Sequence, residues 1–204
     1  MNELAVTLTG RFVTLTPLTL DDVGGLVHAA SGDRSTFKWS LIPDDLAGME
    51  VVVRRLLDDQ DGRTAVPFVT RHRDTGEIIG MTRFLLLRWW LERPYPDAAE
   101  IGGTFLAAPW QRTPCNTEAK LLMLSHAFDE WDVRRLDLKS DARNERSRRA
   151  MERLGATFEG VLRNWQPSQV DGEEGRTRDT SMYSILPSEW PAIKARLVER
   201  LQTT

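Results

Sequence analysis

The stretch AEIGGTFLAAPWQRTPCNTEA, residues 99–119, decides the fold of this 204-residue chain. Its first part, Glu100 to Ala107, reads as a strand, and Gly102-Gly103 inside it predicts a bulge or a close approach of another backbone. After a turn over Gln111 to Thr113, Pro114 occupies the first position of a helix, where proline is favoured. The stretch therefore predicts a bulged strand that leads into a capped helix.

The same alternation continues in LDLKSDARNERSRRAMERLGATFEGVLR, residues 136–163. Apolar and polar residues alternate over Arg135 to Ser140, as in a half-buried strand. Asn144 can cap the next helix, and Gly155 is a natural stop for it. Two more strands and a last helix are predicted downstream: Phe158 to Gln166, Arg178 to Leu186, and a helix from Ser188.

Upstream, the pattern changes from helical to extended spacing. The residues predict a strand over Phe12 to Leu15 and a helix over Leu20 to Ala30. A second helix has an apolar stripe from Met49 to Leu57 and ends near Asp61-Gly62. The extended runs Ala65 to Arg71 and Ile78 to Leu87 then form a hairpin that turns at Asp74-Thr75-Gly76. No linker or repeat divides the sequence. We therefore expect one α/β domain, residues 1–204, built around a mixed sheet.

The composition restricts the function classes. With 41% hydrophobic and 28% charged residues, the chain can bury a core and keep a soluble surface. A net charge of -3 gives no overall attraction to nucleic acid or to an anionic membrane. A lone cysteine, Cys115, and three scattered histidines indicate no disulfide and no metal site. The N-terminal residues lack the pattern of a signal peptide, so we expect a cytoplasmic protein.

The two quoted segments and the later RDTSMYSILPSEWP, residues 178–191, resemble the GNAT superfamily of acyl-CoA-dependent N-acyltransferases. The likeness is closest to the Rim-type branch, which is named for ribosomal-protein N-terminal acetyltransferases and also contains many small-molecule enzymes. It covers the element order of the whole chain and the sequence of about residues 100–190. The resemblance implies a mostly antiparallel central sheet with splayed middle strands, flanked by helices on both faces.

The resemblance further implies acetyl-CoA, or another acyl-CoA, as co-substrate. Its pantetheine arm would lie where the strand through Thr104, Phe105, Leu106 and Ala107 separates from its neighbour. A splayed strand leaves backbone groups unpaired, and the amides of pantetheine can satisfy them as an added strand would. The alternative is a purely structural bulge at a bend of the sheet.

The turn before the next helix corresponds to the pyrophosphate-binding pattern Gln/Arg-X-X-Gly-X-Gly/Ala of the family. Gln111 matches, whereas Pro114 and Asn116 replace the two small residues. Because proline has no N–H, one phosphate donor is lost, but the helix N-terminus remains suited to an anion. The expected cofactor contacts here are Gln111, Arg112, Thr113, Cys115, Asn116 and Thr117. An ordinary capped helix is the alternative.

Asn144 and Ser147 lie one helical turn apart on one face. In the family the asparagine contacts the coenzyme arm, although Asn144 can instead serve only as a helix cap. Many members carry a tyrosine that protonates the departing thiolate, and Met151 stands at that position here. Ser147 is the substitute candidate, with water or direct release of the thiolate as alternatives. For the nearby arginines we favour a solvated helix face: Arg143, Arg146, Arg148 and Arg149.

Glu100 is the candidate general base, because the family often has a carboxylate at the start of the splayed strand. To act at neutral pH, a carboxylate needs a raised pKa or a proton relay. A surface charge on an edge strand is an equally weighted alternative. Asp97 and Glu92 on the preceding loop are weaker candidates.

Aromatic residues in the segments expected to line the acceptor site are Trp39, Trp89, Trp90 and Tyr95. The acceptor amine stays open between a small molecule and a protein N-terminus, and a homodimer is compatible with the resemblance. The acidic loop at Asp171 to Glu174 would favour a cationic acceptor if it overhangs the cleft, but a solvated turn is the simpler interpretation. A second hypothesis is a catalytically idle module that senses acyl-CoA. This hypothesis is favoured by Pro114, Asn116 and Met151, which depart from the pattern of the family.

Overall fold

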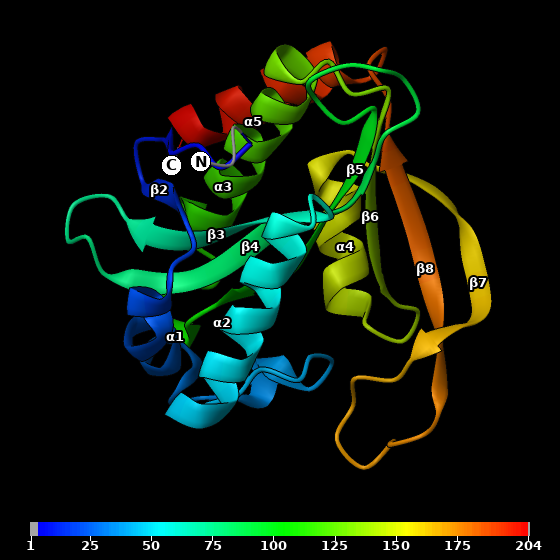
Figure 1. The fold of residues 1–204 in the computed structure, drawn as a ribbon. Coiled ribbons are helices and arrows are strands. Elements are labelled where there is room, and N and C mark those ends of the chain that lie inside the picture. Colours follow the sequence, from blue (N-terminus) through cyan, green and yellow to red (C-terminus); the bar gives the residue numbers. More distant parts are fainter. Residues whose placement is uncertain (1–3, 204) are drawn as a thin grey trace.

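The computed structural model describes residues 4–203 and contains one eight-stranded sheet of order β1-β2-β3-β4-β5-β6-β8-β7 (Figure 1). Each predicted strand is present to within two residues at either end, and a two-residue strand precedes them. The strands are β1 (Leu8–Thr9), β2 (Val13–Pro17), β3 (Ala65–His72), β4 (Ile78–Arg88), β5 (Ala98–Leu106), β6 (Arg135–Asp141), β7 (Thr157–Pro167) and β8 (Thr177–Ile185).

Five α-helices connect or flank the strands, and a single π-helical turn, His126–Glu130, extends the third of them. Within residues 4–203 no helix is both long and apolar enough to span a membrane. The helices are α1 (Val23–Ala30), α2 (Leu46–Asp61), α3 (Pro114–Ser125), α4 (Glu145–Leu154) and α5 (Trp190–Gln202).

β5 and β6 pair in parallel, whereas the other neighbouring strands of the sheet pair antiparallel. Its register covers Ala98↔Arg135 through Glu100↔Asp137. Beyond that point β5 follows β4 and β6 follows β8, so the two strands separate. Gly103 and Thr104 are exposed although β5 is a middle strand. The predicted fold class, with splayed middle strands in a mostly antiparallel sheet, is confirmed.

The bulge predicted at Gly102-Gly103 is present. Met81 pairs with Phe105 and Arg83 pairs with Gly102, so β5 carries one residue more than β4 over this interval. Gly103 adopts a left-handed φ of 57°, which costs a residue with a Cβ more than it costs glycine. The bulge bends β5 where it leaves β6.

Two apolar cores cover the two faces of the sheet. The larger one gathers α3, α4 and α5 and includes Phe84 of β4 and Tyr183 of β8, so it spans both arms of the splayed sheet. The smaller one lies under α1 and α2, includes Met81 and Phe105, and belongs only to the β3–β5 arm. Figure 1 shows α1 and α2 on the β3–β4 part of the sheet, with α2 crossing in front of β4. The opening between β5 and β6 is therefore left without a core on the α1/α2 face.

Glu118 of α3 binds the turn between β1 and β2. Its carboxylate accepts backbone N–H groups of Arg11 (2.7 Å), Phe12 (2.6 Å) and Val13 (2.8 Å). A Cβ on Gly10 would lie 2.4 Å from the carboxyl carbon, so the turn needs glycine there. One buried carboxylate thus fixes the N-terminal strands against the helix that follows the bulge.

Lys120 of α3 is buried between the helix and the sheet without an acidic partner in residues 4–203. Its Nζ donates to Thr82 Oγ1 (2.9 Å) and Thr104 Oγ1 (2.7 Å), and these hydroxyls are 2.8 Å apart. Burial lowers the pKa of Lys120 to about 7. The fold therefore favours the neutral form of this amine more than water does.

Replacement of Lys120 by methionine is expected to stabilise the protein by roughly 2 kcal/mol at pH 6, since the charged form is disfavoured in the fold. The folded pKa lies below the unfolded value, so the cost of burying lysine is complete below pH 7 and disappears as the pH rises toward 10.5. The two threonine hydroxyls can satisfy each other in the variant. Urea unfolding at pH 6 and pH 10 checks this, and an equal gain at both pH values would contradict it.

Candidate functional site

Glu100 lies at the closed end of the opening, on the last residue pair that joins β5 to β6. Its side chain is 3% exposed, and its Oε2 is 3.1 Å from Lys139 Nζ of β6. Burial raises the pKa of Glu100, while the charge and hydrogen bond of Lys139 oppose the shift. It is therefore not a surface charge on an edge strand but a buried carboxyl that takes up a proton more readily than usual.

Further charges surround this carboxyl on β4, β6 and β8. Asp137, opposite Glu100 in the register, accepts hydrogen bonds from Arg88 (2.6 Å) and Arg135 (2.6 Å). Arg178 of β8 is 8% exposed and close enough for the charge of Glu100 to act on its pKa, which burial lowers. Within residues 4–203 no group of histidine, cysteine, aspartate and glutamate side chains is arranged to hold a metal ion.

The two weaker carboxylate candidates lie in different surroundings. Asp97 is fully buried, and its Oδ2 accepts the backbone N–H groups of Trp90 (2.7 Å) and Leu91 (2.9 Å). Burial opposes the shift, but those N–H groups and two neighbouring arginines hold its pKa below the usual range. Asp97 thus shapes the loop between β4 and β5. Glu92 is exposed on that loop.

Gln111 connects three segments at the mouth of the opening. Its Nε2 donates to Leu106 O (2.8 Å) at the end of β5 and to Thr36 Oγ1 (2.9 Å) before α2. Its Oε1 accepts from Arg146 Nη2 of α4 (2.7 Å). The amide therefore positions the turn before α3 and holds Arg146 beside it.

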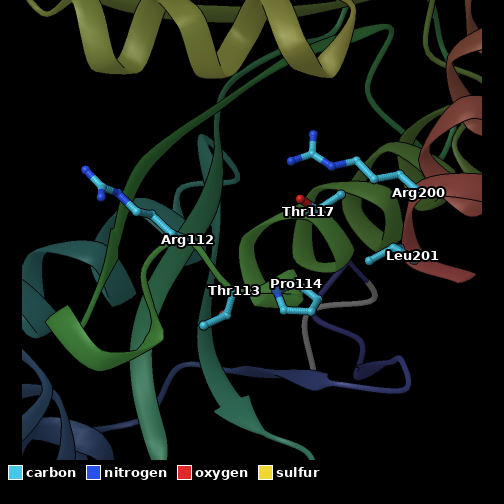
Figure 2. A pocket seen from close by; sticks show the side chains of 6 residues that line it. All are labelled: Arg112, Thr113, Pro114, Thr117, Arg200 and Leu201. Atoms are coloured by element: carbon cyan, nitrogen blue, oxygen red, sulfur yellow. The ribbon is translucent and has the colours of Figure 1, made fainter. Parts of the chain in front are cut away.

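The first turn of α3 forms a small basic pocket of about 120 Å³. Thr113 caps the helix by accepting from Cys115 N (3.4 Å), and Arg112 before it is exposed with a left-handed φ of 61°. Figure 2 shows Arg112 extending from the turn and Arg200 extending from α5 toward Thr117. The residues that line the pocket are Arg112, Thr113, Pro114, Thr117, Arg200 and Leu201.

Two positive charges meet at this turn. Burial and the neighbouring charge of Arg112 lower the pKa of Arg146. Two like charges repel each other unless an anion lies between them. Arg112 and Arg146 are therefore suited to a phosphate group at the N-terminus of α3. The predicted cofactor contacts differ in exposure: Asn116 and Thr117 are partly exposed, whereas the side chain of Cys115 is buried.

Asn144 caps α4, because its Oδ1 accepts from Ser147 N (3.1 Å). Ser147 is partly exposed, and Met151 is buried in the large core. Tyr183 of β8 reaches the same helix, where its hydroxyl donates to Glu152 Oε1 (3.0 Å). The structural role of Asn144 is thus present, whatever else its amide does.

Arg143 joins two loops at the open end of the site. It forms ion pairs with Asp141 and, at 2.8 Å, with Glu173 of the β7–β8 loop, whose pKa it lowers to about 2. Its guanidinium also lies 5.0 Å from the ring centre of Trp39.

A pocket of about 500 Å³ lies next to Trp39. It separates the loop between α1 and α2 from the β7–β8 loop, to which Gln169 and Asp171 belong. The acidic loop is thus connected through Arg143 to Asp141 at the end of β6, and Asp171 lines this pocket.

The four aromatic candidates do not lie together. Trp39 is near the loops at the open end, while the other three belong to the loop between β4 and β5 at the opposite end of β5 (Figure 1). Trp89 Nε1 donates to Arg63 O (3.3 Å), and Trp90 and Tyr95 are exposed. Trp39 alone of the four is thus grouped with the pocket between the loops.

Comparisons with known proteins agree with this geometry. A family model described as an acetyltransferase (GNAT) domain matches residues 13–157. A GCN5-related N-acetyltransferase from Brucella melitensis is 28% identical with a TM-score of 0.83, over 96% of this chain and 85% of that one. An acetyltransferase from T. thermophilus is 32% identical with a TM-score of 0.77, over 96% of both chains.

The fold also resembles that of Mycobacterium smegmatis RimJ, which was solved in complex with CoA-disulfide. That chain is 20% identical with a TM-score of 0.78, over 96% of this chain and 95% of that one. The likeness to a Rim-type structure expected from the sequence is thus present at the level of the fold. A search of curated proteins found no match.

Proposed function

Since this chain belongs to the GNAT acetyltransferase family, we propose that it moves an acetyl or other short acyl group from acyl-CoA to a primary amine by direct attack in a ternary complex. The observation that carries the proposal is the separation of β5 from β6 directly beyond the buried Glu100. This arrangement provides a slot for an extended coenzyme arm, with an ionisable carboxyl at its closed end.

The residues present fit acyl-CoA. Among residues 4–203, β5 and β6 do not pair with each other beyond Glu100 and Asp137, which leaves backbone groups there for the amides of pantetheine. For the pyrophosphate, the N-terminus of α3 offers backbone N–H groups, and Arg112 and Arg146 offer charge. Pro114 and Asn116 alter the usual turn, but Thr113 still caps the helix, and the N–H groups that follow Cys115 remain at its N-terminus.

Arg112→Ala and Arg146→Ala are each expected to weaken acetyl-CoA binding about tenfold, with a smaller effect at high salt, because charge-assisted contacts to phosphate are screened. Arg149→Ala is the matched control, since Arg149 lies on the same helix but pairs with exposed Glu145. Isothermal titration at two salt concentrations measures the effect. Unchanged affinity in both variants would remove this turn from the phosphate site.

In the proposed mechanism Glu100 accepts a proton from the incoming amine, directly or through a water. An amine must lose its proton before it attacks, and a carboxyl with a raised pKa is a better acceptor than an ordinary one. A backbone N–H of β5 is suited to donate to the carbonyl oxygen that becomes negative. Ser147 is the proposed donor toward the departing thiolate, since Met151 has no proton to give.

The acceptor would enter between the α1–α2 loop and the β7–β8 loop, beside Trp39. That pocket mixes apolar side chains such as Phe37 and Leu41 with the charges of Arg34, Lys38 and Asp171. A small amine or a protein N-terminus can fit this mixture. Trp89, Trp90 and Tyr95 would contact only an acceptor that extends over the far end of β5.

Two assays together test the function: binding of acetyl-CoA, and release of free thiol in the presence of amines. Binding with release supports the transferase. Binding without release to any amine would favour the alternative, an idle acyl-CoA sensor, which Pro114, Asn116 and buried Met151 make a specific candidate. Absence of binding at millimolar acetyl-CoA would contradict both.

A homodimer is part of the proposal. β7 is an edge strand, and four large apolar side chains on it are exposed, a pattern common at contacts between subunits: Phe158, Val161, Leu162 and Trp165. Sedimentation analysis of the purified protein tests this, and a monomer at micromolar concentration would contradict it.

A further inference from the structure

Arg83 of β4 carries a charge without a partner anion beside the opening. Its guanidinium makes no salt bridge and no hydrogen bond with any of residues 4–203. Burial lowers its pKa, and Arg55 adds to this, whereas Asp59 and Glu100 oppose it from beyond contact distance.

Two other arginines around the opening are neutralised within the fold. Arg88 lies 2.6 Å from Asp137, and Arg143 lies 2.8 Å from Asp141. A partly buried cation without an anion is costly, and the cost is removed when a ligand supplies the anion. The guanidinium of Arg83 is therefore a group that a ligand would complete.

The position of Arg83 relates it directly to the proposed base. Arg83 pairs with Gly102, and Leu85 pairs with Glu100, so Arg83 and Glu100 are diagonal neighbours on one face of the sheet. A Cβ on Gly103 would lie 2.8 Å from Arg83 Nε, and a Cβ on Gly102 would lie 3.1 Å from Glu100 Oε1. The two glycines thus leave the sheet surface between the carboxyl of Glu100 and the guanidinium of Arg83 without side chains.

From this arrangement we propose that the acceptor amine carries a carboxylate or phosphate a few bonds away, and that Arg83 binds this anion while the amine faces Glu100. The inference rests on the proposed transferase function and names the class of its acceptor. A guanidinium matches either anion with two parallel hydrogen bonds. Diagonal neighbours on a sheet are about 7 Å apart, which suits an amine and an anion on one small end group.

A second arginine flanks Glu100 from the other arm of the sheet. Arg178 of β8 is held by Gln166, whose amide oxygen accepts its Nη2 at 2.7 Å in the orientation that satisfies both groups. The charges of Asp141 and Glu100 both oppose the lowering of the pKa of Arg178 by burial, so this arginine is already balanced by carboxylates and Arg83 is the one left for the anion of the acceptor.

The anion belongs to the acceptor rather than to the acyl group. The coenzyme arm would lie between β5 and β6, whereas Arg83 stands on β4, on the other side of β5. Arg83 also faces α2, through Asp59 and Arg55, and thus the face from which the acceptor enters.

The test uses matched amine pairs with acetyl-CoA: amino acids against their amides, and phosphoethanolamine against ethanolamine. The anionic member is expected to have at least a tenfold higher kcat/KM, although the amide has the less basic and more readily available amine. Arg83→Gln is expected to reduce this preference about tenfold, mainly through KM, and Arg83→Lys to retain part of it. Arg54→Gln, an exposed arginine of α2 paired with Glu50, is the control.

The two kinds of pair separate the two anions, since a carboxylate site favours the amino acids and a phosphate site favours phosphoethanolamine. Equal use of both members, a preference that survives in Arg83→Gln, or preference for succinyl-CoA over acetyl-CoA with neutral amines would overturn the inference. Binding of acetyl-CoA without transfer to any of the anionic amines would also overturn the inference, but it would not contradict the proposed coenzyme site. If acetyl-CoA itself does not bind, the proposed function fails first.

Discussion

Replacement of Glu118 by alanine is expected to lower the free energy of unfolding by about 4 kcal/mol, a large part of the ~5–15 kcal/mol typical of a domain. The carboxylate accepts three backbone N–H groups of the turn between β1 and β2. Hydrogen bonds to a charged group contribute roughly 1.5–3 kcal/mol each, and the three N–H groups lose their partner together. For a chain of this size the melting temperature is expected to fall by roughly 10 °C.

The matched control is Glu145→Ala, because Glu145 is exposed on α4 and pairs only with exposed Arg149. Its expected effect is below about 0.5 kcal/mol. Gly10→Ala offers a second variant, since its Cβ would meet the carboxyl of Glu118 at 2.4 Å. That substitution should cost less in the Glu118→Ala background than in the original protein. Urea unfolding measures these four variants and the original protein, and a loss below about 1 kcal/mol for Glu118→Ala would refute the anchoring role.

Glu100→Gln is expected to reduce kcat by roughly 10²- to 10³-fold while acetyl-CoA affinity stays within about twofold, as loss of a general base requires. The base must be ionised to act, so activity should rise with pH through the raised pKa of Glu100. In the glutamine variant this acid limb of the pH profile should disappear. The exposed Glu92→Gln, on the neighbouring loop, should leave both quantities unchanged.

Lys139→Met separates catalysis from architecture. The charge of Lys139 opposes the upward shift of the pKa of Glu100, so its removal should move the acid limb to higher pH. A merely structural ion pair would not produce such a shift. An unchanged pH profile in both Glu100→Gln and Lys139→Met would remove Glu100 from the mechanism.

The order of elements could be predicted because each one has a local signature. The Gly102-Gly103 pair predicted the bulge, and Asn144 and Gly155 marked both ends of α4, which runs from Glu145 to Leu154. The strand β1 was missed, since a segment of two residues becomes a strand only through its pairing with β2. Periodicity carries no information about such pairing.

The candidate site could be predicted only in part, because partners distant in sequence decide it. Glu100 was singled out from the resemblance, but its burial and its pairing with Lys139 depend on the parallel register. Arg143 and Arg146 are exposed, as a solvated helix face requires, yet each binds a side chain at least 30 residues away: Glu173 and Gln111.

Buried charges on α3 were the clearest omission. Glu118 and Lys120 stand among apolar residues in the sequence TEAKLLML, and that setting was a usable signal that both are buried. Their partners were not readable, since Glu118 binds backbone groups and Lys120 binds two threonine hydroxyls. The proximity of Arg83 to Gly103 was equally hidden, because it follows from the shifted register of β4 and β5.

Three residue pairs between β5 and β6 connect two parts of the sheet, β1 to β5 and β6 to β8. Beyond these pairs, residues 101–106 of β5 stay paired with β4 but not with β6, over about 20 Å at ~3.3 Å per residue. A rotation of about 5° of one part of the sheet against the other therefore moves the far end of β5 by roughly 2 Å relative to β6. The larger core packs against both parts, whereas the smaller core packs against the part that contains β3, β4 and β5. The core under α1 and α2 therefore supports β5 but not β6, and the core of α3, α4 and α5 is the one that spans both parts of the sheet.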